Sequence, residues 1–205
     1  MLIALRTLQR KYRLAVEGVL HVGAHHGEEA DDYDRAGYAP VYWVEADEDS
    51  IPGLMKTVHD RVHHHVVHAV VADEPRVVAF NRASNGQSSS ILEFGTHSRE
   101  HPDVVFIGRQ RLLATTIDEL AQRGLIGRAN FMNLDIQGAE LLALRGGTQY
   151  LSGVDYIYSE VNERELYRGC CLLTEFDDWL GVRGFTRVAL KMTVHGWGDA
   201  FYVRG

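Results

Sequence analysis

Acidic side chains follow three separate runs of β-forming residues, each at the point where the run ends: Glu45, Asp135 and Glu160. In an open α/β sheet the ligand crevice lies outside the carboxyl ends of the strands. We therefore expect the three carboxylates to face one site. A carboxylate placed there accepts hydrogen bonds from hydroxyl groups, removes a proton from one, or binds a divalent cation.

A glycine-containing turn precedes all three acids, where residues 22–27 read V-G-A-H-H-G. Glycine at a strand-to-helix turn lets a ligand approach the backbone closely, and the first turn of the helix has free N–H groups. A tight structural turn is the alternative interpretation. Four residues of the turn are predicted to contact a cofactor: Gly23, Ala24, His25 and Gly27.

Glu45 lies 22 residues after Gly23. An acid at this spacing is typical of a carboxylate that accepts hydrogen bonds from the two hydroxyls of a ribose. We expect Asp47 and residues 70–73 to border the adenine of the same cofactor. A solvated loop acid is the alternative for Glu45.

A metal site is predicted at the ends of the fourth and fifth sheet strands. Asp135, Glu160 and Asn162 all offer oxygen ligands, which suit Mg²⁺, and neighbouring strand ends lie close enough to share one ion. Without a metal, Asp135 would bind the amino group of the cofactor and Glu160, the other candidate catalytic acid, would orient the acceptor. Asp135 or His195 would then be the catalytic base.

Two further segments are open to more than one interpretation. His195 begins the short glycine-containing link at residues 195–199 and is a candidate general base, or a hydrogen-bonding turn residue. Tyr167, Arg168 and Cys170 are either part of a substrate lid or a packed loop.

The elements that position these residues alternate between strand-like and helix-like patterns, which is typical of βαβ units. The last two expected strands are joined by residues 192–198 only, which is too short for a parallel crossover, so they must be antiparallel. We predict a doubly wound, mostly parallel seven-stranded sheet with an antiparallel last strand, and an additional strand at residues 76–80. The expected sheet strands are residues 19–22, 41–44, 65–71, 130–134, 154–158, 185–191 and 199–203, and the expected helices are residues 28–36, 51–58, 116–122, 139–144 and 172–180.

Three groups of residues resemble the FkbM family of methyltransferases: residues 22–27 with Glu45, residues 134–141 with residues 144–147, and residues 159–162. The family usually reads D-x-E-G-A-E in the second group, where this chain has Gln137 in place of the first Glu. The resemblance implies a Rossmann-like class I methyltransferase that depends on S-adenosylmethionine. It also implies O-methylation of a sugar, a polyketide or another secondary metabolite.

Two other functions share part of this pattern. A nicotinamide-dependent oxidoreductase also has a glycine turn and an acid after the second strand, but the third glycine is missing here and the sheet of such a fold stays parallel. A non-catalytic subunit that binds the cofactor and supports a partner is the other alternative.

Composition sets the remaining expectations. The 205 residues suit one domain, residues 1–205, in which residues 1–15 form an N-terminal helix that caps the domain or packs against a second copy in a homodimer. A formal net charge of −7 without a basic stripe argues against a nucleic-acid partner and leaves a small-molecule acceptor. Two adjacent cysteines and no long apolar run predict a cytoplasmic protein without a disulfide framework or a membrane span.

Overall fold

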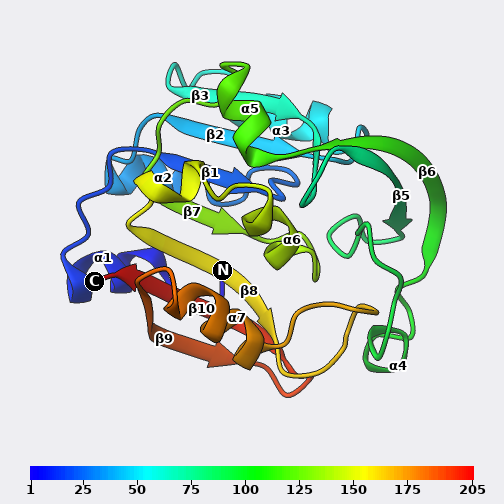
Figure 1. Ribbon diagram of the computed structural model, residues 1–205. Coiled ribbons are helices and arrows are strands. Elements are labelled where there is room, and N and C mark those ends of the chain that lie inside the picture. Colours follow the sequence, from blue (N-terminus) through cyan, green and yellow to red (C-terminus); the bar gives the residue numbers. More distant parts are fainter.

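Seven strands form the central sheet of the computed structural model, which describes residues 1–205. Their order is β3-β2-β1-β7-β8-β10-β9, and β10 runs antiparallel to both of its neighbours while the other pairs are parallel (Figure 1). The strands are β1 (Val19–Val22), β2 (Val41–Glu45), β3 (His64–His68), β7 (Phe131–Leu134), β8 (Tyr156–Asn162), β9 (Phe185–Met192) and β10 (Trp197–Arg204). The predicted mostly parallel sheet with an antiparallel last strand is confirmed.

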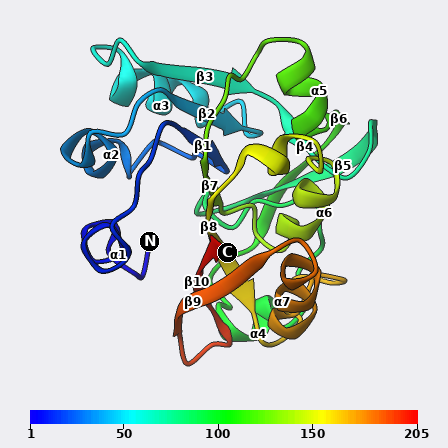
Figure 2. The same ribbon diagram turned by 60° about the vertical axis from the view of Figure 1, so that its left-hand side comes forward.

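Helices cover both faces of this sheet, with α1, α2 and α3 on one side and α5, α6 and α7 on the other (Figure 2). Each face has its own core: Leu8 and Leu54 are buried on the first, and Leu144 and Leu180 on the second. The bounds are α1 (Leu5–Tyr12), α2 (Ala30–Ala36), α3 (Ile51–Val58), α5 (Ile117–Gln122), α6 (Glu140–Arg145) and α7 (Leu173–Gly181), with a 3₁₀ turn at Tyr150–Gly153. Burial on both faces explains why the central strands read as continuous apolar runs.

A second sheet of three strands projects beyond the carboxyl ends of the central strands (Figure 1). It contains β4 (Val70–Val71), β5 (Arg76–Ala83) and β6 (Phe106–Thr115), and the short helix α4 (His97–Glu100) lies in the connection from β5 to β6. The additional strand expected at residues 76–80 is confirmed as β5. Residues 65–71, expected as one strand, are divided between β3 and β4, so the chain changes sheets here.

Strand β8 continues beyond its predicted end. Glu160 pairs with Asp199 and Asn162 pairs with Trp197, so the antiparallel partner β10 holds both residues in extended backbone. The sequence of β8 alone does not show this, because the extension depends on a partner strand that is distant in the sequence.

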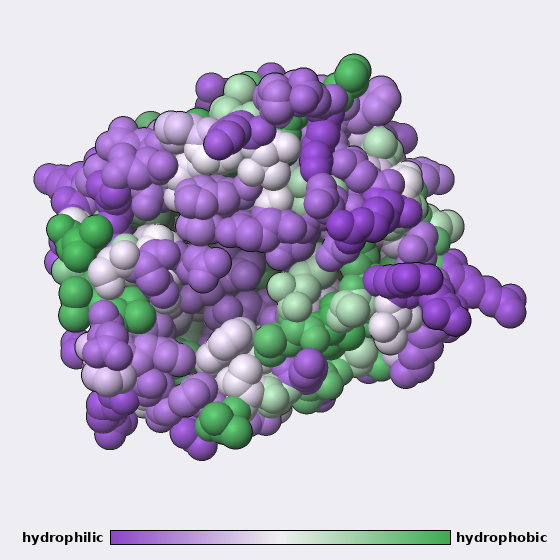
Figure 3. Space-filling view, turned by 180° about the vertical axis from the view of Figure 1, so that it is seen from behind, coloured by the Kyte–Doolittle hydropathy of each residue, from purple (hydrophilic) through white to green (hydrophobic).

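The surface is mostly polar on the face turned away from the viewer in Figure 1, with smaller hydrophobic areas (Figure 3). None of the helices combines the length and the apolar character that crossing a bilayer requires. The predicted N-terminal helix, α1, has Leu5 and Leu8 buried in the core of its own chain.

Candidate functional site

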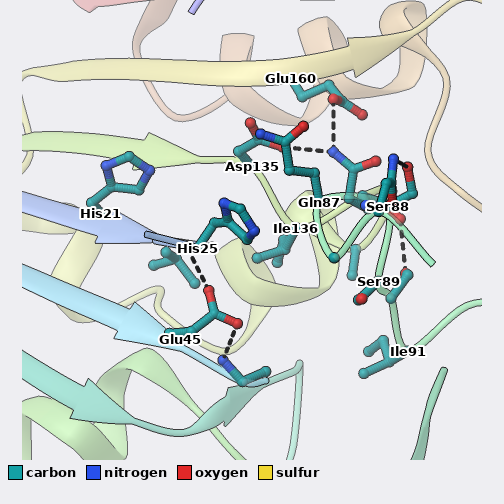
Figure 4. A pocket seen from close by; sticks show the side chains of 18 of the residues that line it. His21, His25, Glu45, Gln87, Ser88, Ser89, Ile91, Asp135, Ile136 and Glu160 are labelled. Atoms are coloured by element: carbon teal, nitrogen blue, oxygen red, sulfur yellow. Dashed lines mark hydrogen bonds between the residues drawn. The ribbon is translucent and has the colours of Figure 1, made fainter. Parts of the chain in front are cut away.

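A cavity of about 470 Å³ lies at the carboxyl ends of β1, β2, β7 and β8. Residues 85–91, which follow β5, form the opposite wall, so the small sheet closes the side that the central sheet leaves open (Figure 4). Three of the predicted acids, Glu45, Asp135 and Glu160, line this one cavity. The sequence-based expectation that strand ends gather these carboxylates agrees with their position.

The glycine turn brings the ends of β1 and β7 into contact. Gly23 has a φ of 89°, and an added Cβ would lie 1.8 Å from the carbonyl oxygen of Asp135, so only glycine fits. His25 also has a positive φ, 43°, and lines the cavity. Ala24 and Gly27 lie behind the cavity wall, Ala24 in the core and Gly27 against Leu54. Gly23 and His25 are thus the predicted turn residues that a ligand can reach.

Glu45 is held by backbone donors. Its carboxylate accepts hydrogen bonds from the N–H groups of His25 at 2.6 Å, Ala46 at 2.8 Å and Asp47 at 2.7 Å. Burial raises the pKa of Glu45, although these three donors favour its ionised form. The result is a carboxylate with a defined position at the cavity wall.

Asp47 does not line the cavity. Its carboxylate accepts a hydrogen bond from the N–H of Asp49 and lies 3.3 Å from Nε of Arg82. This buried side chain therefore joins the loop after β2 to the small sheet, and we assign it no contact with a ligand.

Apolar side chains line the cavity next to Glu45. Val70 and Val71, within the range expected to border an adenine, are part of this wall, whereas residues 72 and 73 are not. Phe80 and Ile91 extend the apolar surface from the small sheet and its loop. The arrangement suits a flat, apolar ring beside a hydroxylated one.

His25, His26 and Glu28 form the one group of three potential metal-ligating residues whose ligand atoms lie within 4.8 Å of one another. Nδ1 of His25 is 2.6 Å from the Glu28 carboxylate, and this hydrogen bond raises the pKa of His25. Burial opposes the ionisation of Glu28, but the bond from His25 and nearby backbone amides lower the pKa of Glu28 to about 2. The two groups form an ion pair at the wall of the cavity.

Asp135 and Glu160 share one hydrogen-bond donor. Nε2 of Gln137 donates to Oδ1 of Asp135 at 2.7 Å and to Oε2 of Glu160 at 3.0 Å. Asp135 is open to the cavity, but protein surrounds the cavity itself, and this burial raises the pKa of Asp135 to about 6. Burial and the charge of Asp135 raise the pKa of Glu160 well above its usual value. Both acids therefore hold a proton more strongly than an ordinary carboxyl group does.

Two other contacts hold Gln137 itself. Oε1 of Gln137 accepts a 2.6 Å hydrogen bond from the hydroxyl of Tyr167, and its backbone carbonyl accepts one of 2.8 Å from Ser90. Tyr167 is completely buried. Of the two interpretations of residues 167–170, the position of Tyr167 favours the packed loop.

Two further predicted residues, His195 and Asn162, also lie outside the cavity lining. Nδ1 of His195 is 2.9 Å from a carboxylate oxygen of Glu100, so this partly exposed imidazole joins its turn to α4. Asn162 is buried, and its Oδ1 has no hydrogen-bond partner. Because Asn162 does not face the cavity and an amide nitrogen lies between Asp135 and Glu160, the geometry lends no support to the predicted magnesium site.

Sequence analysis did not identify the residues on the far side of the cavity. His97, His101 and Trp197 line it, and burial lowers the pKa of His97 to about 4, which keeps this imidazole neutral. The i, i+4 spacing of His97 and His101 was the available signal. Their approach to the strand ends depends on β6, which the sequence analysis did not predict.

A family model described as the methyltransferase FkbM domain matches residues 21–187. No match was found among curated protein sequences.

Two solved structures described as methyltransferases have a similar fold. An FkbM methyltransferase from Methylobacillus flagellatus KT aligns with a TM-score of 0.60 and 15% identity over 91% of this chain and 43% of that one. This chain therefore spans less than half the length of that protein. Magnesium protoporphyrin IX methyltransferase from Synechocystis PCC 6803, solved with bound S-adenosylmethionine, aligns with a TM-score of 0.55 and 11% identity over 98% and 76% of the two chains. At these identities the structures show a shared fold.

Proposed function

The chain belongs to the FkbM methyltransferase family, and from this premise we propose that it transfers a methyl group from S-adenosylmethionine to a hydroxyl group of a small molecule. The observation that carries the proposal is the meeting of Gly23, Glu45 and the Asp135–Glu160 pair in one cavity. The first two suit a nucleoside cofactor, and the pair suits proton removal.

The residues present fit S-adenosylmethionine. At Gly23 an added side chain would overlap Asp135, so the backbone lies bare at the turn where the methionine part would bind. Glu45 would accept hydrogen bonds from the ribose hydroxyls, and Val70 and Val71 would contact the adenine. When bound, the cofactor would supply an electrophilic methyl group attached to a positively charged sulfur.

The Asp135–Glu160 pair would remove the proton of the acceptor. An alcohol is a weak nucleophile, and a base positioned beside it assists the reaction. Burial raises the pKa of Asp135 to about 6, which places its ionised form near neutral pH and lets it accept a proton there. His97 and Trp197 line the part of the cavity that would hold the acceptor.

The family match favours this function over a nicotinamide-dependent oxidoreductase. The pair of ionisable acids in the cavity favours an enzyme over a subunit that only binds the cofactor.

Calorimetry with S-adenosylhomocysteine and with NAD, followed by a screen of hydroxylated compounds with methyl-labelled S-adenosylmethionine, tests the proposal. We expect binding of S-adenosylhomocysteine but not of NAD, and label transfer to at least one hydroxyl acceptor. Binding of NAD alone, or transfer only to amines or thiols, would contradict it.

A further inference from the structure

We infer that Gln137 takes the place that a divalent cation would occupy between Asp135 and Glu160, so that its neutral amide holds the two carboxylates together. The inference rests on the proposed function for its role in methyl transfer, but not for its geometry. Gln137 is then a positioning residue, because it acts through the two acids rather than on the substrate.

Both hydrogens and the carbonyl oxygen of the Gln137 amide take part in hydrogen bonds. A glutamine NH₂ group has two hydrogens, and Nε2 of Gln137 lies 2.7 Å from Asp135 and 3.0 Å from Glu160, one hydrogen for each carboxylate. The carbonyl oxygen accepts the hydroxyl of Tyr167 at 2.6 Å. A flipped amide would turn its oxygen toward two carboxylates, so the surroundings select one orientation.

No other side chain offsets the repulsion between the two acids; the N-terminal ammonium acts on Asp135 by its charge, but it pairs with Glu29. Neither Asp135 nor Glu160 takes part in an ion pair, and the cavity lining contains no lysine or arginine. Asp199 and Glu140 lie close enough for their charges to act on the pair. The donor that the two acids share is therefore the side-chain contact that holds them together.

The backbone around Gln137 is shaped to present this amide. The residue has a φ of 57°, a left-handed conformation that is uncommon outside glycine. Ser90 bonds its carbonyl, and an added Cβ on the adjacent Gly138 would lie 2.9 Å from Cβ of Cys170. Packing and hydrogen bonds from two loops thus maintain a conformation that costs energy, as is common at functional sites.

Replacing the amide of Gln137 by a carboxylate exchanges a hydrogen-bond donor for an acceptor and keeps the shape of the side chain. Gln137→Glu would remove both hydrogens and place a third acid against Asp135 and Glu160. Three clustered carboxylates are the oxygen ligands that Mg²⁺ and Mn²⁺ prefer. We expect this variant to bind Mn²⁺ at least tenfold more tightly than the wild-type protein does.

Calorimetric titration with Mn²⁺ alone compares the wild type, Gln137→Glu and the control Asn85→Asp. Asn85 lines the same cavity, but its side chain bonds Ser88 and neither of the two acids, so the control adds an equal charge away from the position of Gln137. Tight Mn²⁺ binding by Gln137→Glu only is the expected result. Equal affinity in all three proteins, or equal gains in both variants, would overturn the inference.

Gln137→Met provides a second test that does not require the first variant to fold. It keeps the length of the side chain but removes the bridge. We expect kcat to fall at least tenfold with an unchanged KM for S-adenosylmethionine, and the pH profile of kcat to move to higher pH, because the acids would then repel without relief. A parallel loss at every pH would indicate a merely structural residue and overturn the inference.

Chelation separates this inference from the proposed function. We expect EDTA to leave wild-type methyl transfer unchanged and Mn²⁺ to restore transfer in Gln137→Glu. Wild-type activity that EDTA abolishes and Mg²⁺ restores would overturn the cation replacement but not the methyltransferase. Failure of the wild type to bind S-adenosylhomocysteine would overturn the proposed function. The Mn²⁺ titration would still test whether Gln137 takes the place of a cation.

Discussion

Carboxyl groups at the site are held by two kinds of donor, and the difference separates their functions. Glu45 accepts three backbone N–H groups, and Glu140 accepts those of Ile136 and Gly138. Backbone donors have fixed positions, so these acids keep one geometry. Asp135 and Glu160 instead share a side-chain amide. Of the two rigid acids only Glu45 lines the cavity, where it suits recognition of a ligand, and the shared pair suits proton transfer.

We expect Glu45→Ala to weaken the binding of S-adenosylhomocysteine by about 1–3 kcal/mol, the usual cost of losing hydrogen bonds to a charged group. Glu48→Ala is the matched control, because Glu48 lies in the same loop but is exposed and bonds Gln110 instead of lining the cavity. Calorimetry measures both variants. Equal affinity in Glu45→Ala and the wild type would remove Glu45 from the cofactor site.

The Asp135–Glu160 pair also predicts a pH dependence. Burial raises the pKa of Asp135 to about 6 and that of Glu160 further, so the first ionisation of the pair occurs near pH 6. A base works only when deprotonated, so we expect kcat to rise about tenfold per unit below this pH and to level off above it. The apparent value belongs to the pair rather than to one residue. A rate that does not change between pH 5 and pH 8 would show that neither acid is the base.

Among the elements, the turn after β1 determines how closely two strand ends approach. Gly23 donates its N–H to Val44 of β2 at 2.9 Å, and the N–H of Asp135 donates to Val22 of β1 at 3.0 Å. The ends of three strands are thus linked by two backbone hydrogen bonds beside one glycine.

Gly23→Ala should therefore destabilise the fold more than an ordinary glycine substitution. Gly37→Ala is the control, because Gly37 also has a positive φ, 73°, but an added Cβ would meet no atom within 4 Å. We expect the control to lose about 1–2 kcal/mol from its left-handed backbone alone. Gly23→Ala should lose more, because its Cβ would overlap the carbonyl of Asp135. Urea denaturation compares the two, and equal losses would contradict the close contact.

The sequence predicted the central strands better than the cavity roof, for a physical reason. β1, β2 and β7 are buried on both faces and end at a glycine or an acid, so short apolar runs reveal them. β6 reads F-I-G-R-Q-R-L-L-A-T and is half exposed, so its sequence contains glycine and charged residues that obscure a strand pattern. Gly23, Glu45, Asp135 and Glu160 could be identified, whereas His97 and Ser90 depended on the fold of the segment between β5 and β6.

At the scale of the whole molecule, charge is distributed unevenly between the cavity and the rest of the chain. Twenty-one lysines and arginines offset 28 acids overall, but none of these basic residues lines the cavity. The acids that line it are Glu28, Glu29, Glu45, Asp135, Glu160 and Asp199. His25 pairs with Glu28 and the N-terminal ammonium with Glu29, while His97 stays uncharged, so the other acids keep the potential inside this partly enclosed space negative.

This potential predicts which acceptors the site admits. A cavity with walls of low dielectric strengthens interactions between charges, so an acceptor that carries a carboxylate or a phosphate would be repelled. We expect a neutral hydroxylated acceptor to have a kcat/KM on the order of tenfold or more above that of its carboxylated counterpart, which corresponds to about 1.4 kcal/mol in the transition state. Matched pairs such as a glycoside and the corresponding uronide, assayed with labelled S-adenosylmethionine, measure this ratio. The difference should persist at high salt, because charges inside the cavity are screened less than those on the surface. Preference for the anionic member of several pairs would show that a positively charged group from elsewhere reaches the acceptor.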